Sequence, residues 1–208
     1  MNKKIIFAIG RQFGSGGRAI GRILSQRLGI PFYDKDILTQ AAKQSGLSGE
    51  VMSYFDEAPN NSLLYSLSTG VYSMGDIGVA NYTLPVNQQV FQAQFDAIRA
   101  LAEEGPCVIV GRCADYVLEK YPFLVSAFIY ADLPKRMERV AEYDEVTLAE
   151  AKSRIAKSDK KRANYYNFYS GKKWGMAATY DLCINSTIIG YENAADLIVQ
   201  FAERKYPE

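Results

Sequence analysis

The stretch "FAIGRQFGSGGRAIGRIL", residues 7–24, joins an apolar run to a glycine-rich turn and then to apolar residues at helical spacing. The run at residues 5–9 predicts a strand buried on both faces, and Ala19, Ile20, Ile23 and Leu24 predict the helix. Phosphate-binding loops have this order because the N–H groups of a glycine-rich turn converge on an anion at the helix N-terminus. The stretch is therefore a candidate phosphate loop.

The stretch departs from the usual phosphate-loop pattern, GxxxxGK[ST], whose lysine reaches the outer phosphates and whose hydroxyl binds Mg²⁺. With Gly16 as the glycine before the lysine position, Arg11 replaces the first glycine, Gly17 the lysine and Arg18 the hydroxyl. The letters "GSGGRA" also satisfy GxGxx[GA], with Asp34 about twenty residues later, as in a dinucleotide site. A dinucleotide-dependent oxidoreductase and a turn without a ligand stay open as alternatives here.

The composition is that of an ordinary globular domain. The 208 residues are 48% hydrophobic and carry a formal net charge of +1, which favours neither nucleic acid nor a membrane as partner. The sequence contains no histidine, which excludes imidazole acid–base catalysis and histidine-ligated zinc. The three cysteines form no CxxC pair, which favours a reducing cytoplasm and gives no metal site.

Short apolar strands alternate with helices along the chain, which predicts a doubly wound α/β fold with a five-stranded parallel sheet. After the first strand, further strands are expected in "IPFYD", "CVIV", "VSAFIYA" and "YDLCIN". Helices are expected over residues 35–44, about 90–101, 133–143, 148 to about 165, and 194–201. Thr147 and Glu150 form a capping box before the fourth of these helices.

Four further segments make a family likeness specific: "CVIVGRCADYVL" from 107, "FIYADLPKRMERV" from 128, "RIAKSDKKRANYY" from 154 and "YDLCINST" from 180. With the opening loop they resemble the cytidylate kinase-like branch of the P-loop nucleoside monophosphate kinases, over nearly the whole chain. That family's loop typically reads like "FGSGGR", without the standard lysine. The resemblance implies a three-layer α/β/α P-loop fold that uses ATP and Mg²⁺ and phosphorylates a nucleoside monophosphate, CMP or a related small metabolite.

The resemblance also implies where the ligands bind. Gly111 and Arg112 match the Gly-Arg that grips the acceptor monophosphate, although Cys113 stands where cytidylate kinases have aspartate. Asp159 and Arg162 match an Asp and Arg three residues apart in the lid, which help to hold the acceptor. The residues assigned to ATP are Arg11, Phe13, Gly14, Ser15, Gly16, Gly17, Arg18 and Ala19.

Phosphoryl transfer needs several cations around the phosphates, and arginine suits this because its planar fork binds two oxygens at once. We expect Arg18, Arg112, Arg154 and Arg162 to be the catalytic cations, with Arg11, Lys157 and Lys161 in reserve. Residues 154, 157 and 161 share one helical face. That face either closes over the phosphates, in a lid over about 147–175, or is the solvated basic face of a surface helix.

Asp34 and Asp36 in "FYDKD" stand at the C-terminal end of the second strand, where open α/β sheets bind ligands. They resemble the metal- or acceptor-binding carboxylates of shikimate-kinase-type enzymes. A helix N-cap and a helix-dipole partner are equally good interpretations. With no Ser or Thr after the loop and Val110 on the third strand, Ser15 and Asp34 are the remaining protein candidates for Mg²⁺.

The rest of the chain gives three weaker expectations. One domain is expected, with a core of residues 1–45 and 86–208 and an inserted acceptor-side subdomain at about 46–85, because so long a plain loop is unusual. Capping of the acceptor and formation of a homodimer are both open for that insert. Cys113 is expected to be a buried filler. Packing is favoured over base stacking for the aromatic residues after the basic helix, Tyr165, Tyr166, Phe168, Tyr169 and Trp174.

The sequence therefore predicts a cytoplasmic kinase that moves the γ-phosphoryl group of ATP to a nucleoside monophosphate. The alternatives are a shikimate-kinase-type enzyme, a nucleotide-binding module without transfer activity, and the oxidoreductase.

Overall fold

The computed structural model describes residues 4–34, 37, 46, 48–50 and 86–207. Its five strands form one parallel sheet in the order β2-β3-β1-β4-β5. The strands are β1 (Ile6–Arg11), β2 (Phe32–Tyr33), β3 (Cys107–Val110), β4 (Leu124–Tyr130) and β5 (Leu182–Asn185). The helices are α1 (Gly17–Leu28), α5 (Val86–Glu104), α6 (Ala114–Val117), α7 (Leu133–Asp144), α8 (Leu148–Ser170), the 3₁₀ helix η1 (Ala177–Thr179), α9 (Ser186–Ile189) and α10 (Tyr191–Lys205).

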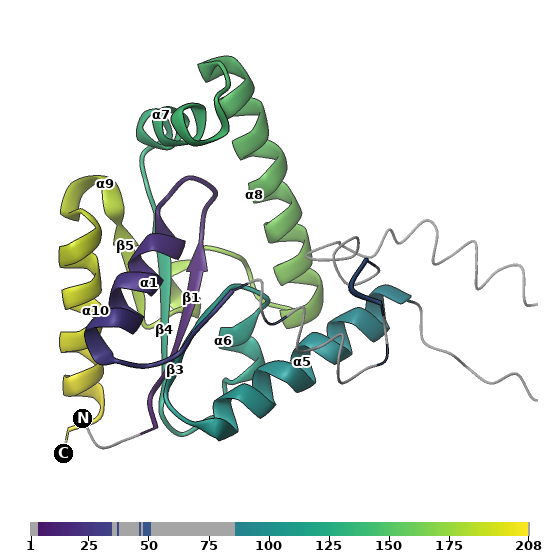
Figure 1. The fold of residues 1–208 in the computed structure, drawn as a ribbon, viewed down its shortest axis with the longest axis vertical. Coiled ribbons are helices and arrows are strands. Elements are labelled where there is room, and N and C mark those ends of the chain that lie inside the picture. The colour runs from purple at the N-terminus through teal and green to yellow at the C-terminus, as the bar shows by residue number, and fades with distance from the viewer. Residues whose placement is uncertain (1–3, 35–36, 38–45, 47, 51–85, 208) are drawn as a thin grey trace, which may run out of the picture.

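Helices cover both faces of the sheet, as Figure 1 shows. Along β1 the side chains alternate between two cores: Ile6 and Ala8 pack with residues of α5, whereas Phe7 and Ile9 pack with residues of α1 and α10. All four are at most 1% exposed, which explains why the strand is a continuous apolar run. The predicted three-layer α/β/α fold is confirmed.

The sheet has its switch point at β1, which pairs with β3 on one side and β4 on the other. In such sheets the crevice that binds ligands lies outside the carboxyl ends of the strands. The paired helices α7 and α8 stand at this end of the sheet (Figure 1). The capping box of Thr147 and Glu150 is confirmed at the start of α8, which ends at Ser170 rather than near residue 165.

Two four-residue helices, α6 and α9, were not predicted, because four residues are too few to show a helical period. The helix expected at 35–44, apart from the buried helical residue Ile37, and almost all of the expected insert at 46–85 lie outside the described residues. In the part of the chain that is described, no helix has the length and apolar character needed to cross a membrane.

Candidate active site

The glycine-rich turn between β1 and α1 is held open by backbone geometry that favours glycine. Gly14 and Gly16 have φ angles of 75° and 82°. A Cβ atom at Gly14 would lie 2.9 Å from Cγ2 of Val140, and one at Gly16 would overlap the ring of Tyr191. In the structure the protein's own side chains approach them.

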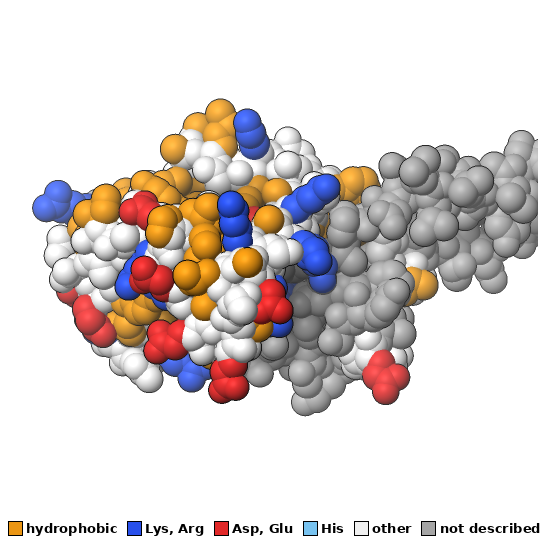
Figure 2. All heavy atoms as spheres, turned by 90° about the horizontal axis from the view of Figure 1, so that it is seen from above, with side chains coloured by type: hydrophobic (Ala, Val, Ile, Leu, Met, Phe, Trp, Pro, Cys, Tyr) orange, Lys and Arg blue, Asp and Glu red, His pale blue; other side chains and the backbone are white. Residues whose placement is uncertain are grey.

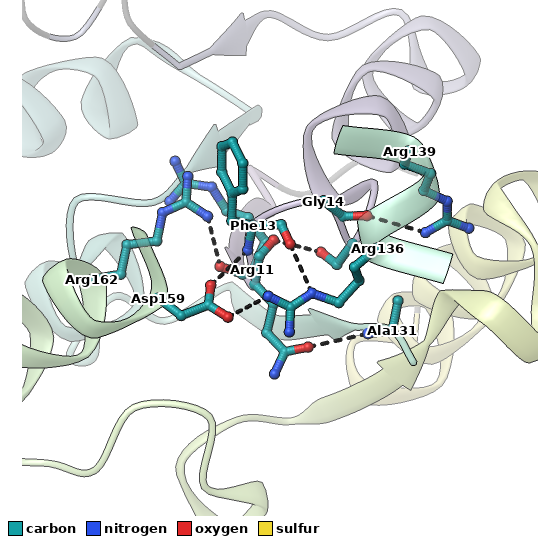
Figure 3. A network of polar contacts seen from close by, with 10 residues as sticks. Arg11, Phe13, Gly14, Ala131, Arg136, Arg139, Asp159 and Arg162 are labelled. Carbon is teal, nitrogen blue, oxygen red and sulfur yellow. Dashed lines mark hydrogen bonds and ion pairs between the residues drawn. The ribbon is translucent and has the colours of Figure 1, made fainter. Parts of the chain in front are cut away.

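Three consecutive carbonyl groups of the turn are bound from one side. The carbonyl of Phe13 accepts from Arg136 Nε at 2.8 Å, and that of Gly14 from Arg139 Nη1 at 3.3 Å. The carbonyl of Ser15 accepts from Oγ of Ser186 at 2.5 Å. Figure 3 shows Arg139 reaching the turn from one side and Arg162 from the other. The carbonyl oxygens are therefore held toward α7 and α9.

This arrangement orients the amides of the turn. In a trans peptide the N–H of the next residue points opposite to the carbonyl, so the N–H groups of Gly14 and Gly16 point away from α7 and α9. Among the described residues, the N–H groups of Gly14, Gly16, Gly17 and Arg18 have no acceptor. Those of Gly17 and Arg18 belong to the first turn of α1, whose donors point out of the helix.

Beside the turn lies a cleft of about 690 Å³ with a strongly basic lining. Four of its arginines come from separate elements: β1, α1, the turn after β3, and α8. Viewed from above, the molecular surface carries basic side chains interspersed with hydrophobic and acidic ones (Figure 2). The charged and aromatic side chains that line the cleft are Arg11, Phe13, Arg18, Arg22, Asp34, Arg112, Tyr143 and Arg162.

Asp34, which is 5% exposed, is the counterion of this cluster. Its Oδ1 lies 3.0 Å from Nη1 of Arg112 and 3.9 Å from Nη2 of Arg11, and its Oδ2 lies 2.7 Å from Nε of Arg18. Since both oxygens face guanidinium groups, Asp34 is placed to hold arginines beside the turn. Asp36 lies outside the described residues.

The residues predicted to bind Mg²⁺ do not fit a metal site in this arrangement. Ser15 is 0% exposed, and its hydroxyl donates to the carbonyl of Gln12 at 2.9 Å. The carboxylate of Asp34 is engaged by arginines. Within the described ranges, no group of three or more Cys, Asp or Glu side chains is gathered to hold a metal ion.

The turn after β3 brings Arg112 into the cleft through unusual backbone geometry. Gly111, Arg112 and Cys113 have φ angles of 84°, 51° and 55°. Non-glycine residues with positive φ cost about 1–3 kcal/mol each and gather at functional sites. The turn places the guanidinium of Arg112, whose side chain is 3% exposed, against Asp34. Cys113 is buried, as expected.

The structure does not bring all the residues expected on α8 into the cleft. Arg162 lines it, donates to the carbonyl of Arg11 at 3.3 Å and lies 5.6 Å from the ring centroid of Phe13. Asp159 instead lies beneath the turn, where it accepts from the N–H of Phe13 at 2.8 Å and pairs with Arg136. Figure 3 shows Asp159 between Phe13 and Arg136.

The basic face of α8 remains exposed to solvent. Arg154 pairs with Asp144 at 2.7 Å, and the Arg154 side chain is 50% exposed. Lys157 and Lys161 are also exposed. None of the three lines the cleft, so the structure favours the solvated-face interpretation for this position of the helix.

Sequence reasoning assigned no role to the two arginines that bind the turn from α7. Arg136 and Arg139 are spaced three residues apart, which places both on one face of α7. That spacing is the signal that could have identified them. Ser186 also binds the turn, but it is the first residue of a helix that is too short to be recognised from the sequence.

A small cavity of about 20 Å³, enough for one water molecule, adjoins the cleft behind Arg11, Arg112 and Arg162. On its far side the hydroxyl of Tyr166 donates to Oδ2 of Asp115 at 2.6 Å. Tyr166 is buried in an aromatic cluster with Tyr165, as the packing interpretation predicted. Burial raises the pKa of Asp115, and the hydrogen bond from Tyr166 offsets this only in part.

The Asp115→Asn variant is expected to change how stability depends on pH. The folded protein binds the Asp115 proton more tightly than the unfolded chain, so wild-type stability should fall as pH rises from about 4 through the raised pKa. The variant lacks this loss and should gain stability relative to wild type between pH 4 and 8, as measured by urea unfolding. Glu119→Gln, which removes an exposed carboxylate near Lys172, is the control. Parallel pH curves for wild type and Asp115→Asn would contradict the assignment.

Three comparisons place this chain among known proteins. A crystal structure of an uncharacterized protein from Eubacterium ventriosum is 32% identical, with a TM-score of 0.71, and the match covers 96% of this chain and 99% of that one. Shikimate kinase from Bacteroides thetaiotaomicron has the same fold, with a TM-score of 0.53 at 13% identity over 97% of each chain. A 159-residue stretch is 28% identical to the uronate isomerase of Corynebacterium glutamicum, which covers 76% of this chain.

The uronate isomerase is much longer than this chain, which spans only 30% of its length. The model of the cytidylate kinase-like family, in contrast, matches residues 6–188, from the first residue of β1 to α9. This range includes the glycine-rich turn, the Gly-Arg turn after β3, and helices α7 and α8, which contact the loop. The chain therefore belongs to the cytidylate kinase-like family.

Proposed function

We propose that this protein is a kinase that transfers the γ-phosphoryl group of ATP to a nucleoside monophosphate or a similar small phosphorylated acceptor. Membership of a kinase-like family supports phosphoryl transfer to a small molecule. The observation that carries the proposal is the convergence of four arginines on one cleft beside the glycine-rich turn: Arg11, Arg18, Arg112 and Arg162.

We assign the glycine-rich turn to the polyphosphate of ATP and Arg112 to the phosphate of the acceptor. The amides of Gly14, Gly16 and Gly17, which have no acceptor among the described residues, suit the polyphosphate of ATP, because such N–H groups bind anions at a helix N-terminus. Arg112 comes from a different element, the turn after β3, and suits the acceptor's phosphate. The arginines would exchange the carboxylate of Asp34 for these phosphates, and Asp34 would serve as the counterion that keeps the cluster in place without ligand.

The proposed mechanism consists of positioning and charge neutralisation, which is most of what phosphoryl transfer requires. The guanidinium groups bring two anions together and neutralise charge on the transferred group. No protein ligand is assigned to Mg²⁺, because neither Ser15 nor Asp34 presents an unoccupied oxygen to the cleft.

A coupled assay of ADP release tests the proposal. With MgATP, ADP release is expected to depend on addition of one of a panel of nucleoside monophosphates that includes CMP. Shikimate and NAD are the comparison compounds, the second in a thermal-shift titration. ADP release that depends on shikimate but on none of the nucleoside monophosphates would favour the shikimate-kinase-type alternative. ATP binding without turnover on any acceptor would favour a binding module, and a shift with NAD but not ATP would favour an oxidoreductase.

A further inference from the structure

Gly17 occupies the place of the usual phosphate-loop lysine, and its backbone does not require glycine. It is the first residue of α1, and it is not among the residues with positive φ. Glycine at a helix position costs about 0.5–1 kcal/mol relative to alanine, so an ordinary backbone angle gives no reason for it. The reason must lie in what surrounds the residue.

The side chain of Arg11 fills the space that a side chain at residue 17 would need. A Cβ atom on Gly17 would lie 2.5 Å from Cβ and 3.2 Å from Cγ of Arg11, and 3.3 Å from Cβ of Ile129. The first contact involves the base of the Arg11 side chain, which cannot swing aside. A lysine at residue 17 and a side chain at residue 11 therefore exclude each other.

A second glycine makes room for the other end of Arg11. A Cβ atom on Gly111 would overlap the guanidinium, so Arg11 crosses from the end of β1 to lie on the backbone of Gly111. Its side chain is 12% exposed and lines both the cleft and the small cavity beside Arg112. Arg11 is thus held between two glycines with its charge at the cleft.

Of the three arginines that face Asp34, Arg11 is the most distant. Nη2 of Arg11 lies 3.9 Å from Oδ1 of Asp34, whereas Arg112 and Arg18 approach the same carboxylate to 3.0 Å and 2.7 Å. Asp34 is therefore paired more closely with Arg112 and Arg18 than with Arg11.

We propose that Arg11 supplies the phosphate-binding cation whose usual source, a lysine at residue 17, is missing. The positive charge comes from residue 11 at the end of β1 instead of residue 17 in the first turn of α1. Residue 17 is glycine because the side chain of Arg11 occupies the space beside it. This inference rests on the proposed function, since it names the residue that binds the outer phosphates of a nucleoside triphosphate. An arginine at this place can bind two phosphate oxygens with its planar fork, whereas a lysine presents a compact point charge.

Exchanging the two residues tests the proposal, with ATP affinity measured by isothermal titration calorimetry. R11G should bind ATP at least about tenfold more weakly, because it loses charge-assisted hydrogen bonds. The double variant R11G/G17K, which restores the usual lysine, should recover most of that affinity. R204A removes an exposed charge at the far end of α10 and should bind ATP as wild type does.

The steric part of the proposal is tested by melting temperature without nucleotide. G17A should lower the melting temperature in the wild-type background and lower it much less when combined with R11G. Equal losses in the two backgrounds would overturn the exchange, and so would wild-type ATP affinity in R11G. A wild-type protein that binds no ATP would overturn both this inference and the proposed function, whereas ATP binding that survives R11G would overturn this inference alone.

Discussion

The Asp159→Asn variant is expected to lower the free energy of unfolding by about 3–5 kcal/mol, the usual cost of breaking a buried ion pair. The carboxylate pairs with Arg136, whose side chain is 6% exposed, and accepts from the N–H of Phe13. Asparagine keeps the shape but not the charge, so the guanidinium of Arg136 is left buried without a counterion. Urea unfolding followed by circular dichroism measures the loss.

The Asp144→Asn variant is a matched control for this measurement. Asp144 and Asp159 are both 18% exposed, and each pairs with an arginine of the α7–α8 pair. Arg154, the partner of Asp144, is 50% exposed, and such surface pairs contribute only about 0–1 kcal/mol. Equal losses in the two variants would show that the pair beneath the turn contributes no more than an exposed one.

The Asp159 substitution should also weaken ATP binding, because the same contacts fix the turn. Asp159 and Arg136 bind the N–H and the carbonyl of Phe13, and so set the peptide planes that lead into Gly14. If Asp159→Asn is destabilised but binds ATP as wild type does at a temperature where it is folded, the turn is positioned by other contacts. Arg139 and Ser186 are the candidates for that role.

Most of the fold could be predicted from the sequence because each strand is buried on both faces. The predicted strand "CVIV" has the same bounds as β3, and the predicted strand "VSAFIYA" differs from β4 by one residue at each end. Local patterns also located the capping box at Thr147, whose partner Glu150 lies one helical turn away. The period of a long helix and the composition of a buried strand are local properties, which a single sequence carries.

The site was harder to predict because its contacts are between residues far apart in the chain. Arg18, Arg112 and Arg162 were expected near phosphates, and the structure brings them to one cleft. Arg154 was chosen by the same reasoning about charge, yet it pairs with Asp144 in solvent. Helical spacing fixes which residues share a face but not what the face meets.

The same limit applies to Asp159, Ser15 and Gly17. The sequence showed a carboxylate in the basic helix, but only the fold shows it beneath the turn with Arg136. It showed a hydroxyl in the loop, but the hydroxyl of Ser15 bonds to Gln12. The absence of lysine was evident at Gly17, whereas the position of Arg11 in that space depends on three-dimensional packing.

The Arg112→Ala variant should have the largest effect on catalysis. Loss of an arginine that neutralises the transferred group costs about 10³–10⁵ in rate in comparable enzymes. Arg112 lies in the turn after β3 and faces the cleft, so kcat/KM for the nucleoside monophosphate should fall by this order. The Kd of ATP should change far less, because the glycine-rich turn that would bind it is a separate element with amide donors of its own.

Stability should change little in this variant, which separates it from Asp159→Asn. The carboxylate of Asp34 keeps Arg18 at 2.7 Å when Arg112 is removed, so no buried charge is left without a partner. Arg112→Lys is the matched variant, since both replacements must adopt the same φ of 51°. Lysine keeps the charge but not the planar fork, so its kcat/KM should lie between those of alanine and wild type. Equal loss of ATP and acceptor binding in Arg112→Ala would mean that Arg112 acts on the whole cluster through Asp34, and the acceptor's phosphate would have to be assigned to another arginine of the cleft.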